Sequence, residues 1–180
     1  MKTSNVLENN FTWEKQQRAL QKIKTFQANG YLLLLSNRTK IFSRFYFEKH
    51  TPTCFSITLI NFIGQTQLKT IFCKNICKIL DNTGKIYVNK QPEITFSAIT
   101  GLTIPLDCLN KWIVGLPEKI HRYTLKNAHI HTLQHLYKKK LLKIIYLYYN
   151  NKNVPFLPNI IKMKQGNNSI VLHINNWILE

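Results

Sequence analysis

Residues 40–60 read KIFSRFYFEKHTPTCFSITLI, and the alternation within them indicates the fold class. Its first half places four side chains on one face of an extended chain: Ile41, Ser43, Phe45 and Phe47. Its second half alternates in the same way, with Phe55, Ile57 and Leu59 on one face and Ser56, Thr58 and Ile60 on the other. A repeat of two residues is the period of a β-strand, because successive side chains point to opposite faces. The stretch therefore predicts two strands of a sheet with one apolar face.

The same period continues on both sides of this stretch. Polar turns such as Asp81-Asn82-Thr83-Gly84 separate the segments, and connections this short join antiparallel neighbours. We predict strands over residues 31–36, 40–48, 55–60, 65–72, 76–80, 85–88, 124–125, 131–137, 141–149, 159–164 and 169–174.

Three segments have the features of helices instead. The first covers residues 13–28, after an N-cap at Thr12 and before a stop at Gly30. The other two cover residues 93–100 and 105–114 and interrupt the run of strands. A sheet this long curls, and helices can fill its hollow side. The predicted fold is mainly β with a few helices (α+β): a curved antiparallel sheet that forms an incomplete, half-open β-barrel, with helices covering the hollow face.

Length and composition limit the class of protein. The chain has 180 residues, 44% of them hydrophobic, which is enough for one globular domain. No run reaches the ~20 apolar residues that a membrane span requires. Residues 1–11 predict a flexible polar tail, and residues 12–180 form the single domain. The eight carboxylates are scattered, with no two spaced to pair on a helix face, so we predict neither an enzyme nor a cofactor.

The charge balance allows an alternative function. The formal net charge is +17, and clustered basic residues bind phosphates, so the alternative is a basic nucleic-acid-binding β-domain. Only four of the 25 basic residues are arginines, which make bidentate contacts with phosphate and guanine. The many lysines accompany abundant Asn, Ile, Phe and Tyr, which all have A- and T-rich codons. We therefore interpret the charge as a solvated surface and expect no nucleic-acid partner.

Two bulky apolar residues, Phe62 and Ile63, lie in a predicted connection directly before Gly64. Turn positions favour Gly, Asn, Asp and Pro, so an apolar pair here is costly unless it is covered or used. Two interpretations follow from the pattern alone. Either the pair folds back onto the core, or it forms a protruding apolar wedge for a membrane or a partner protein.

A cysteine pair, a histidine pair and a run of three lysines allow further alternatives. Cys73 and Cys77 are four residues apart, so they either bridge across a hairpin or, as we predict, are small buried apolar residues. His129 and His131 share one face of a strand, but no further ligand lies close in sequence, so we predict a surface pair without a metal. Residues 138–140, all lysine, predict a solvated hairpin turn or a contact for anionic lipid headgroups.

The order of several landmarks resembles the LolB family of outer-membrane lipoprotein receptors, over roughly residues 13 to 179. The most specific segment reads TGLTIPL at residues 100–106 and continues as WIVGLP at residues 112–117. Further matching features are the helix at Trp13, the strand around Gly30, the strand from Phe42 to Phe47, Leu157-Pro158 and the closing Asn176-Trp177-Ile178. The order and spacing of these features together carry the resemblance.

The resemblance implies a function and a membrane-insertion loop. Proteins similar to LolB accept acylated lipoproteins from a LolA-like periplasmic chaperone and insert them into the inner leaflet of the outer membrane, without ATP. We expect the same partners here, and a monomer. The family carries an exposed apolar residue, usually Leu, before a Gly in a loop between strands, and the matching residue is Ile63. The resemblance therefore favours the wedge, formed by Phe62, Ile63 and Gly64.

The resemblance and the strand pattern together predict an apolar cavity for acyl chains. Its predicted lining is Leu32, Leu34, Phe45, Phe47, Phe55, Ile57, Leu59, Leu106, Leu109, Trp112 and Ile113. Two positions depart from the family, which often has Trp where Phe47 stands and Pro where Phe62 stands. Both residues are apolar, so the predicted cavity is preserved.

The N-terminus also departs from the family. LolB-like proteins are made with a signal peptide that ends in a lipidated cysteine, whereas the first cysteine of this chain is Cys54. The start, Met1-Lys2-Thr3-Ser4-Asn5, shows no apolar segment. We expect the protein at the periplasmic face of the outer membrane, lipid-anchored if a precursor carries the cysteine.

Overall fold

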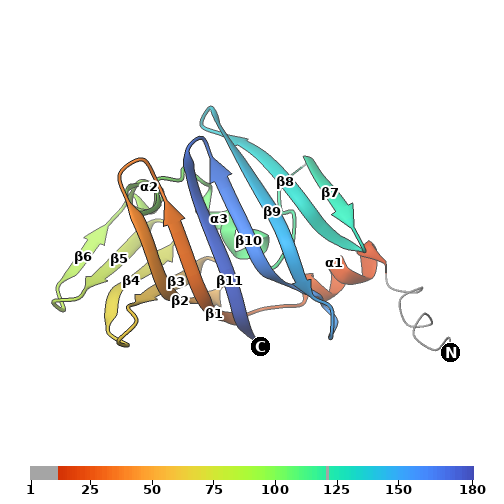
Figure 1. Cartoon of the computed structure of the whole chain (residues 1–180), viewed down its shortest axis with the longest axis horizontal. Coiled ribbons are helices and arrows are strands. Elements are labelled where there is room, and N and C mark those ends of the chain that lie inside the picture. The colour runs from red at the N-terminus through yellow and green to blue at the C-terminus, as the bar shows by residue number, and fades with distance from the viewer. Residues whose placement is uncertain (1–11, 121) are drawn as a thin grey trace.

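The computed structural model describes residues 12–120 and 122–180, and its main feature is one antiparallel sheet (Figure 1). The strands are β1 (Phe26–Leu35), β2 (Lys40–Thr51), β3 (Cys54–Ile60), β4 (Thr66–Cys73), β5 (Ile76–Asp81), β6 (Ile86–Asn89), β7 (Arg122–Lys126), β8 (His129–Tyr137), β9 (Lys140–Asn150), β10 (Leu157–Gln165) and β11 (Asn168–Leu179). The 11 strands lie in the order β6-β5-β4-β3-β2-β1-β11-β10-β9-β8-β7. The sheet curls but stays open, with β6 and β7 at its edges, which confirms the predicted fold class.

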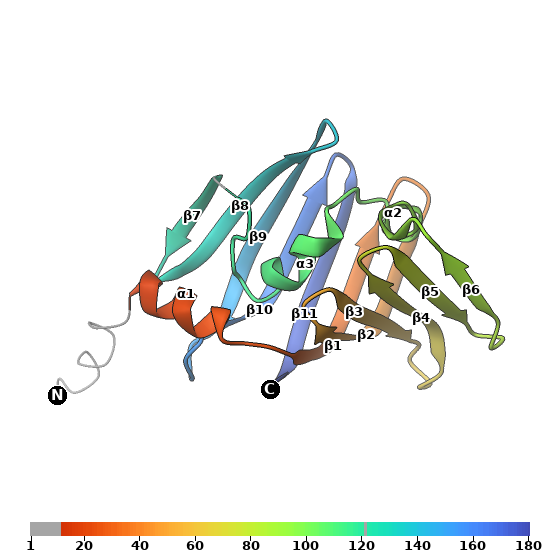
Figure 2. The same cartoon turned by 180° about the vertical axis from the view of Figure 1, so that it is seen from behind.

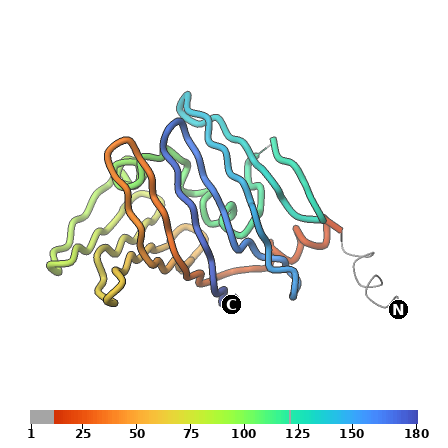
Figure 3. The backbone as a smooth tube through the Cα atoms, viewed as in Figure 1, coloured from red at the N-terminus to blue at the C-terminus, as the bar shows by residue number. Residues whose placement is uncertain are grey.

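The first and last strands meet in the middle of the sheet. The strand β1 pairs with β2 on one side and with β11 on the other, as the tube in Figure 3 shows. Beside this pairing, Thr25 and Glu180 exchange two backbone hydrogen bonds of 3.2 and 3.1 Å. The pairing of β1 with β11 therefore joins the two halves of the sheet, β1–β6 and β7–β11.

The approach of β1 to β11 requires glycine at position 30. A Cβ atom added to Gly30 would lie 1.8 Å from the carbonyl oxygen of His173, closer than any side chain allows. The register of the pair also shifts between Asn29 and Gly30, as at a β-bulge. Gly30 is thus a strand residue that permits close packing, and the prediction that it ends a helix is wrong.

The described residues also form three helices: α1 (Trp13–Gln21), α2 (Pro92–Thr100) and α3 (Leu106–Trp112). Figure 2 shows α2 and α3 on the hollow side of the sheet and α1 across the strand ends near β8 and β9. The buried side chain of Gln16 holds α1 in place. Its Nε2 donates to the carbonyl oxygen of Phe156 at 2.7 Å, and its Oε1 accepts from the backbone N–H of Phe156 at 2.9 Å.

The first helix is shorter than predicted. Thr12 caps it as expected, accepting a hydrogen bond from the backbone N–H of Lys15, but it ends at Gln21 and not at residue 28. Phe26 instead begins β1, where its buried ring lies 5.7 Å from the ring of Phe47 and 5.5 Å from that of Trp177. Burial among these rings outweighs the weak helical pattern, because tertiary packing overrides local propensity.

The cysteines pair differently from either prediction. Cys54 and Cys73 form a disulfide, with Cα atoms 4.2 Å apart. They flank the paired residues Phe55 and Phe72 on adjacent antiparallel strands, so the fold brings them face to face. Cys77 is a free, buried thiol, as predicted, whereas the prediction that Cys73 is also a free buried thiol is wrong.

Candidate functional site

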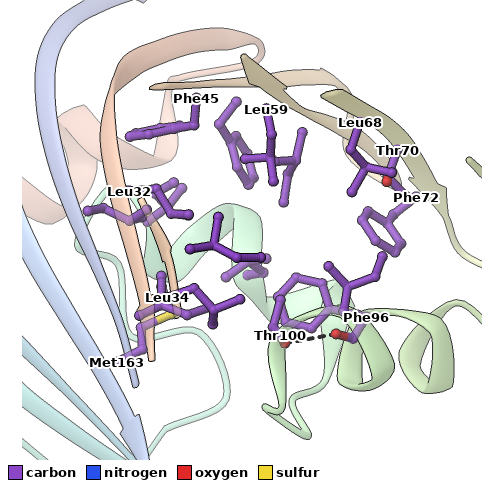
Figure 4. A pocket seen from close by; sticks show the side chains of 18 residues that line it. Leu32, Leu34, Phe45, Leu59, Leu68, Thr70, Phe72, Phe96, Thr100 and Met163 are labelled. Atoms are coloured by element: carbon purple, nitrogen blue, oxygen red, sulfur yellow. Dashed lines mark hydrogen bonds between the residues drawn. The ribbon is translucent and has the colours of Figure 1, made fainter. Parts of the chain in front are cut away.

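A cavity of about 70 Å³ lies between the concave face of the sheet and helices α2 and α3. Figure 4 shows the 18 side chains that line it, all hydrophobic except two threonines. The lining residues are Leu32, Leu34, Ile41, Phe45, Phe47, Ile57, Leu59, Leu68, Thr70, Phe72, Phe96, Ile99, Thr100, Leu109, Ile113, Met163, Ile170 and Leu172. The site therefore offers an apolar surface and no group suited to acid–base or nucleophilic chemistry.

The two threonines differ in their partners. The hydroxyl of Thr100 donates to the carbonyl oxygen of Phe96 at 2.8 Å, within α2. The hydroxyl of Thr70 is buried, and no hydrogen-bond partner for it lies among the described residues. An unpaired buried polar atom reduces stability. Thr70 is the one side chain of the cavity lining with a buried polar atom that lacks a hydrogen-bond partner among the described residues.

A row of aromatic rings crosses the sheet, and two of its members, Phe47 and Phe72, line the cavity. The rings of Phe26, Phe47, Phe55 and Phe72 stack across β1 to β4 with successive centroid distances of 5.7, 5.1 and 5.2 Å. Phe96 of α2 then meets Phe72 edge to face at 5.6 Å. Cross-strand aromatic pairs fix the strand register and add stability beyond their buried area. The row therefore ties the register of these strands to the position of α2.

Eight of the eleven predicted residues border the cavity: Leu32, Leu34, Phe45, Phe47, Ile57, Leu59, Leu109 and Ile113. The prediction is wrong for Phe55 and Leu106, which line a second cleft beside the cavity. It is also wrong for Trp112, which is fully buried and held elsewhere. The Trp112 Nε1 donates to the carbonyl oxygen of Glu118 at 3.2 Å, and its own carbonyl oxygen accepts from Tyr146 at 2.5 Å.

Helix geometry explains the correction for Trp112. Leu109 and Ile113 are four residues apart and share the face of α3 that meets the cavity. Trp112 is rotated from Ile113 by about 100° around the helix axis, since an α-helix has about 3.6 residues per turn. The apolar stripe read from sequence was broader than the face that the sheet covers.

Sequence reasoning missed the contribution of the other half of the sheet. Met163, Ile170 and Leu172 reach the cavity from β10 and β11. Strands covering these residues were predicted, and the alternation along each strand places the side chains on one face. That these strands border the same cavity as the first strands is apparent only from the fold. Phe96 and Ile99 of α2 and Leu68, Thr70 and Phe72 of β4 were missed in the same way.

The loop between β3 and β4 presents the predicted apolar pair to solvent. Ile63 is 78% exposed and Phe62 is 65% exposed, so neither folds back onto the core. Asn61 shapes the loop, because its Oδ1 accepts from the backbone N–H groups of Ile63 and Gln65 at 3.1 and 2.9 Å. Gly64 has a φ of +88°, which glycine adopts without strain. The loop is thus a defined turn that holds Ile63 outward.

The remaining candidates are the histidine pair and the run of lysines. His129 is buried and stacks on Tyr149 at 3.7 Å, so it is not the surface residue that we predicted. Among residues 12–120 and 122–180, no cluster of three or more His, Cys, Asp or Glu side chains could hold a metal ion. Residues 138 and 139 form the predicted turn between β8 and β9, where Lys138 pairs with Glu93 at 3.0 Å.

The open, curled sheet with an apolar interior has a counterpart among solved structures. A LolA superfamily protein from Nitrosomonas europaea superposes with a TM-score of 0.58 at 9% identity, over 94% of each chain. At this identity the likeness concerns the fold alone. The fold and the site together define a LolA-like open-sheet protein built around an apolar cavity.

The sequence comparisons identify the family. The model of the family described as "Outer membrane lipoprotein LolB" matches residues 24–177, and the chain belongs to this family. The Outer-membrane lipoprotein LolB of Serratia proteamaculans is 31% identical over 93% of this chain and 82% of its own length. That of Sodalis glossinidius is 29% identical with the same coverage. The family consists of lipoprotein carriers and receptors and not of enzymes. Among the described residues, no helix is long and apolar enough to cross a membrane.

Proposed function

We propose that this protein accepts acylated lipoproteins from a LolA-like periplasmic chaperone, shelters their acyl chains in the apolar cavity, and releases them into the inner leaflet of the outer membrane. The observation that carries the proposal is the lining of the cavity, where 16 of 18 side chains are hydrophobic. Each buried acyl methylene is worth ~0.8 kcal/mol, so an acylated anchor does not cross water unaided. A cavity that binds it less tightly than the bilayer does allows transfer without ATP.

The cavity has to widen to take up a chain. A volume of about 70 Å³ is smaller than the ~150 Å³ cavity that holds one benzene molecule in another protein. Helices α2 and α3 close one side, so acceptance requires them to move away from the sheet. Their connection is fastened to the sheet by Gln165, which exchanges two hydrogen bonds of 2.7 and 2.9 Å with the backbone of Thr103. The acyl chain would then enter once the cavity of this protein and that of the chaperone are aligned.

The exposed loop supplies the contact with the membrane. Ile63 and Phe62 offer apolar side chains at a turn, and Arg44 lies beneath it, donating from Nη2 to the carbonyl oxygen of Asn61 at 3.4 Å. Basic residues near a membrane surface each gain ~1 kcal/mol from anionic lipids. The disulfide between Cys54 and Cys73 fits the periplasm, since such bonds persist in oxidising compartments. These features support localisation at the periplasmic face, where a precursor cysteine would supply a lipid anchor.

The test follows one acylated lipoprotein from a LolA-like chaperone to this protein and then into liposomes. We expect wild type to accept and deliver it, and Ile63→Glu to accept it but deliver at least tenfold more slowly. A carboxylate at the tip removes apolar contact and adds a charge that costs ~2 kcal/mol or more in lipid. The matched control is Leu141→Glu on β9, which changes a residue that is 54% exposed on the other half of the sheet. Failure of wild type to accept the lipoprotein would overturn the carrier function; normal delivery by Ile63→Glu would overturn only the role of the loop.

A further inference from the structure

A second cleft of about 790 Å³ lies beside the cavity and is far larger. It is bounded by the β2–β3 and β4–β5 turns, the first residues of α2 and α3, and the end of β8. Phe72 lines both spaces, and α3 separates them, with Leu109 toward the cavity and Asn110 toward the cleft. The cleft therefore adjoins the apolar cavity.

The lining of the cleft is mixed, unlike that of the cavity. Phe55, Phe72 and Leu106 contribute apolar surface. The charged residues of the lining are Lys74, Glu93, Asp107 and Lys119. The two carboxylates of the lining are both paired. Glu93 accepts from the hydroxyl of Tyr137 at 2.7 Å and from Lys138 at 3.0 Å, and Asp107 accepts from Lys119 at 2.7 Å. Neither carboxylate is therefore left to hold a cation.

Asn110 is a polar residue of the cleft with an unused hydrogen-bond acceptor. Its side chain is 3% exposed, and its Oδ1 is buried without a hydrogen-bond partner among the described residues. Leaving a buried acceptor unpaired is costly, so native proteins usually satisfy one with ordered water or a bound molecule. The complementary ligand carries an N–H or O–H donor close to apolar groups.

We infer that the cleft binds the polar junction of the lipoprotein anchor, where an amide joins an acyl chain to the terminal cysteine. The amide N–H donates to Asn110 Oδ1 after a rotation of the side-chain amide, and the acyl chains pass Phe72 into the cavity. Ester-linked chains have no such donor, so Asn110 distinguishes an amide-linked chain from a free lipid. This inference rests on the proposed carrier function and names the part of the substrate that the cleft recognises.

The test compares two probes in equilibrium binding: a synthetic triacylated lipopeptide and a fluorescent fatty acid. We expect Asn110→Leu to weaken lipopeptide binding about fivefold to tenfold, as for the loss of one hydrogen bond, and to leave fatty-acid binding unchanged. Leu has a similar size and removes an unpaired acceptor, so the variant should melt no lower than wild type. Asn151→Leu, at an exposed asparagine outside the cleft, is the matched control.

A second arm keeps the wild-type protein and changes the probe. N-methylation of the linking amide removes its donor, and it should weaken binding by the same factor as Asn110→Leu, with no further loss when both changes are combined. Equal binding of the methylated and unmethylated lipopeptides to wild type would overturn the inference while fatty-acid binding upholds the carrier function. If wild type binds neither lipopeptide nor fatty acid, the carrier function fails and the inference fails with it.

Discussion

The ring of Phe62 lies 5.4 Å from the ring of Phe42, which in turn lies 6.1 Å from the ring of Tyr31. Tyr31 and Phe42 are exposed and alternate with the residues that face the cavity, so they lie on the outer face of the sheet. The loop that carries Ile63 is therefore supported by an aromatic row on the face opposite the cavity. The exposed apolar surface therefore extends from the loop tip onto β2 and β1.

Phe42→Ala should weaken binding of the protein to anionic vesicles about twofold to tenfold, because an aromatic pair contributes about 0.5–1.5 kcal/mol. The change removes apolar surface and the support under Phe62 without touching the cavity, so lipoprotein acceptance should be unchanged. Co-flotation with vesicles measures the effect. Tyr148→Ala, at another exposed aromatic residue on β9, is the control. Equal flotation of Phe42→Ala and wild type would show that the row does not meet the membrane.

Thr70→Val should raise the free energy of unfolding by about 1–2 kcal/mol. Valine has nearly the shape of threonine and removes the hydroxyl that is buried without a partner in the cavity. The same change makes the lining more apolar, so binding of a fatty-acid probe should tighten. Urea unfolding measures the stability, with Thr58→Val on the outer face of β3 as the control. A loss of stability in Thr70→Val would mean that bound water satisfies the hydroxyl.

Loss of the Cys54–Cys73 disulfide should lower the free energy of unfolding by about 2–4 kcal/mol. The bridge closes a loop with a sequence separation of 19, which restricts the unfolded chain. Urea unfolding with and without a reductant measures the effect, and it should match that of the double variant Cys54→Ala, Cys73→Ala. The double variant itself should not respond to the reductant. If it does respond, the reductant acts elsewhere in the protein.

Acid should destabilise the protein in part through His129. Burial lowers the pKa of this imidazole below its ordinary value of 6.5. The unfolded chain therefore binds a proton at a higher pH than the folded protein does, and stability falls as the pH drops below about 6.5. His129→Phe keeps a ring against Tyr149 and should reduce the loss of melting temperature between pH 7.5 and 5. His173→Phe, at an exposed histidine, should retain the full loss.

Local patterns in the sequence were sufficient for much of the fold and part of the site. The alternation in β2 and β3 predicts which side chains share the apolar face, because the period of a strand is a property of adjacent residues. Phe45, Phe47, Ile57 and Leu59 consequently share the face that lines the cavity. The apolar pair before Gly64 was visible in the same way, although its exposure was not.

The way in which distant segments combine is apparent only from the three-dimensional fold. The sheet brings Met163 and Leu172 to the same cavity as Leu32, and it places Cys54 against Cys73. It also makes Phe26 the start of a strand, because burial among aromatic rings from other strands outweighs a local helical pattern. Local sequence patterns thus establish which faces of the elements are apolar, because the period of a helix or strand depends on neighbours along the chain. Which of those faces meet, and how much space remains between them, depends on long-range packing that no local period encodes.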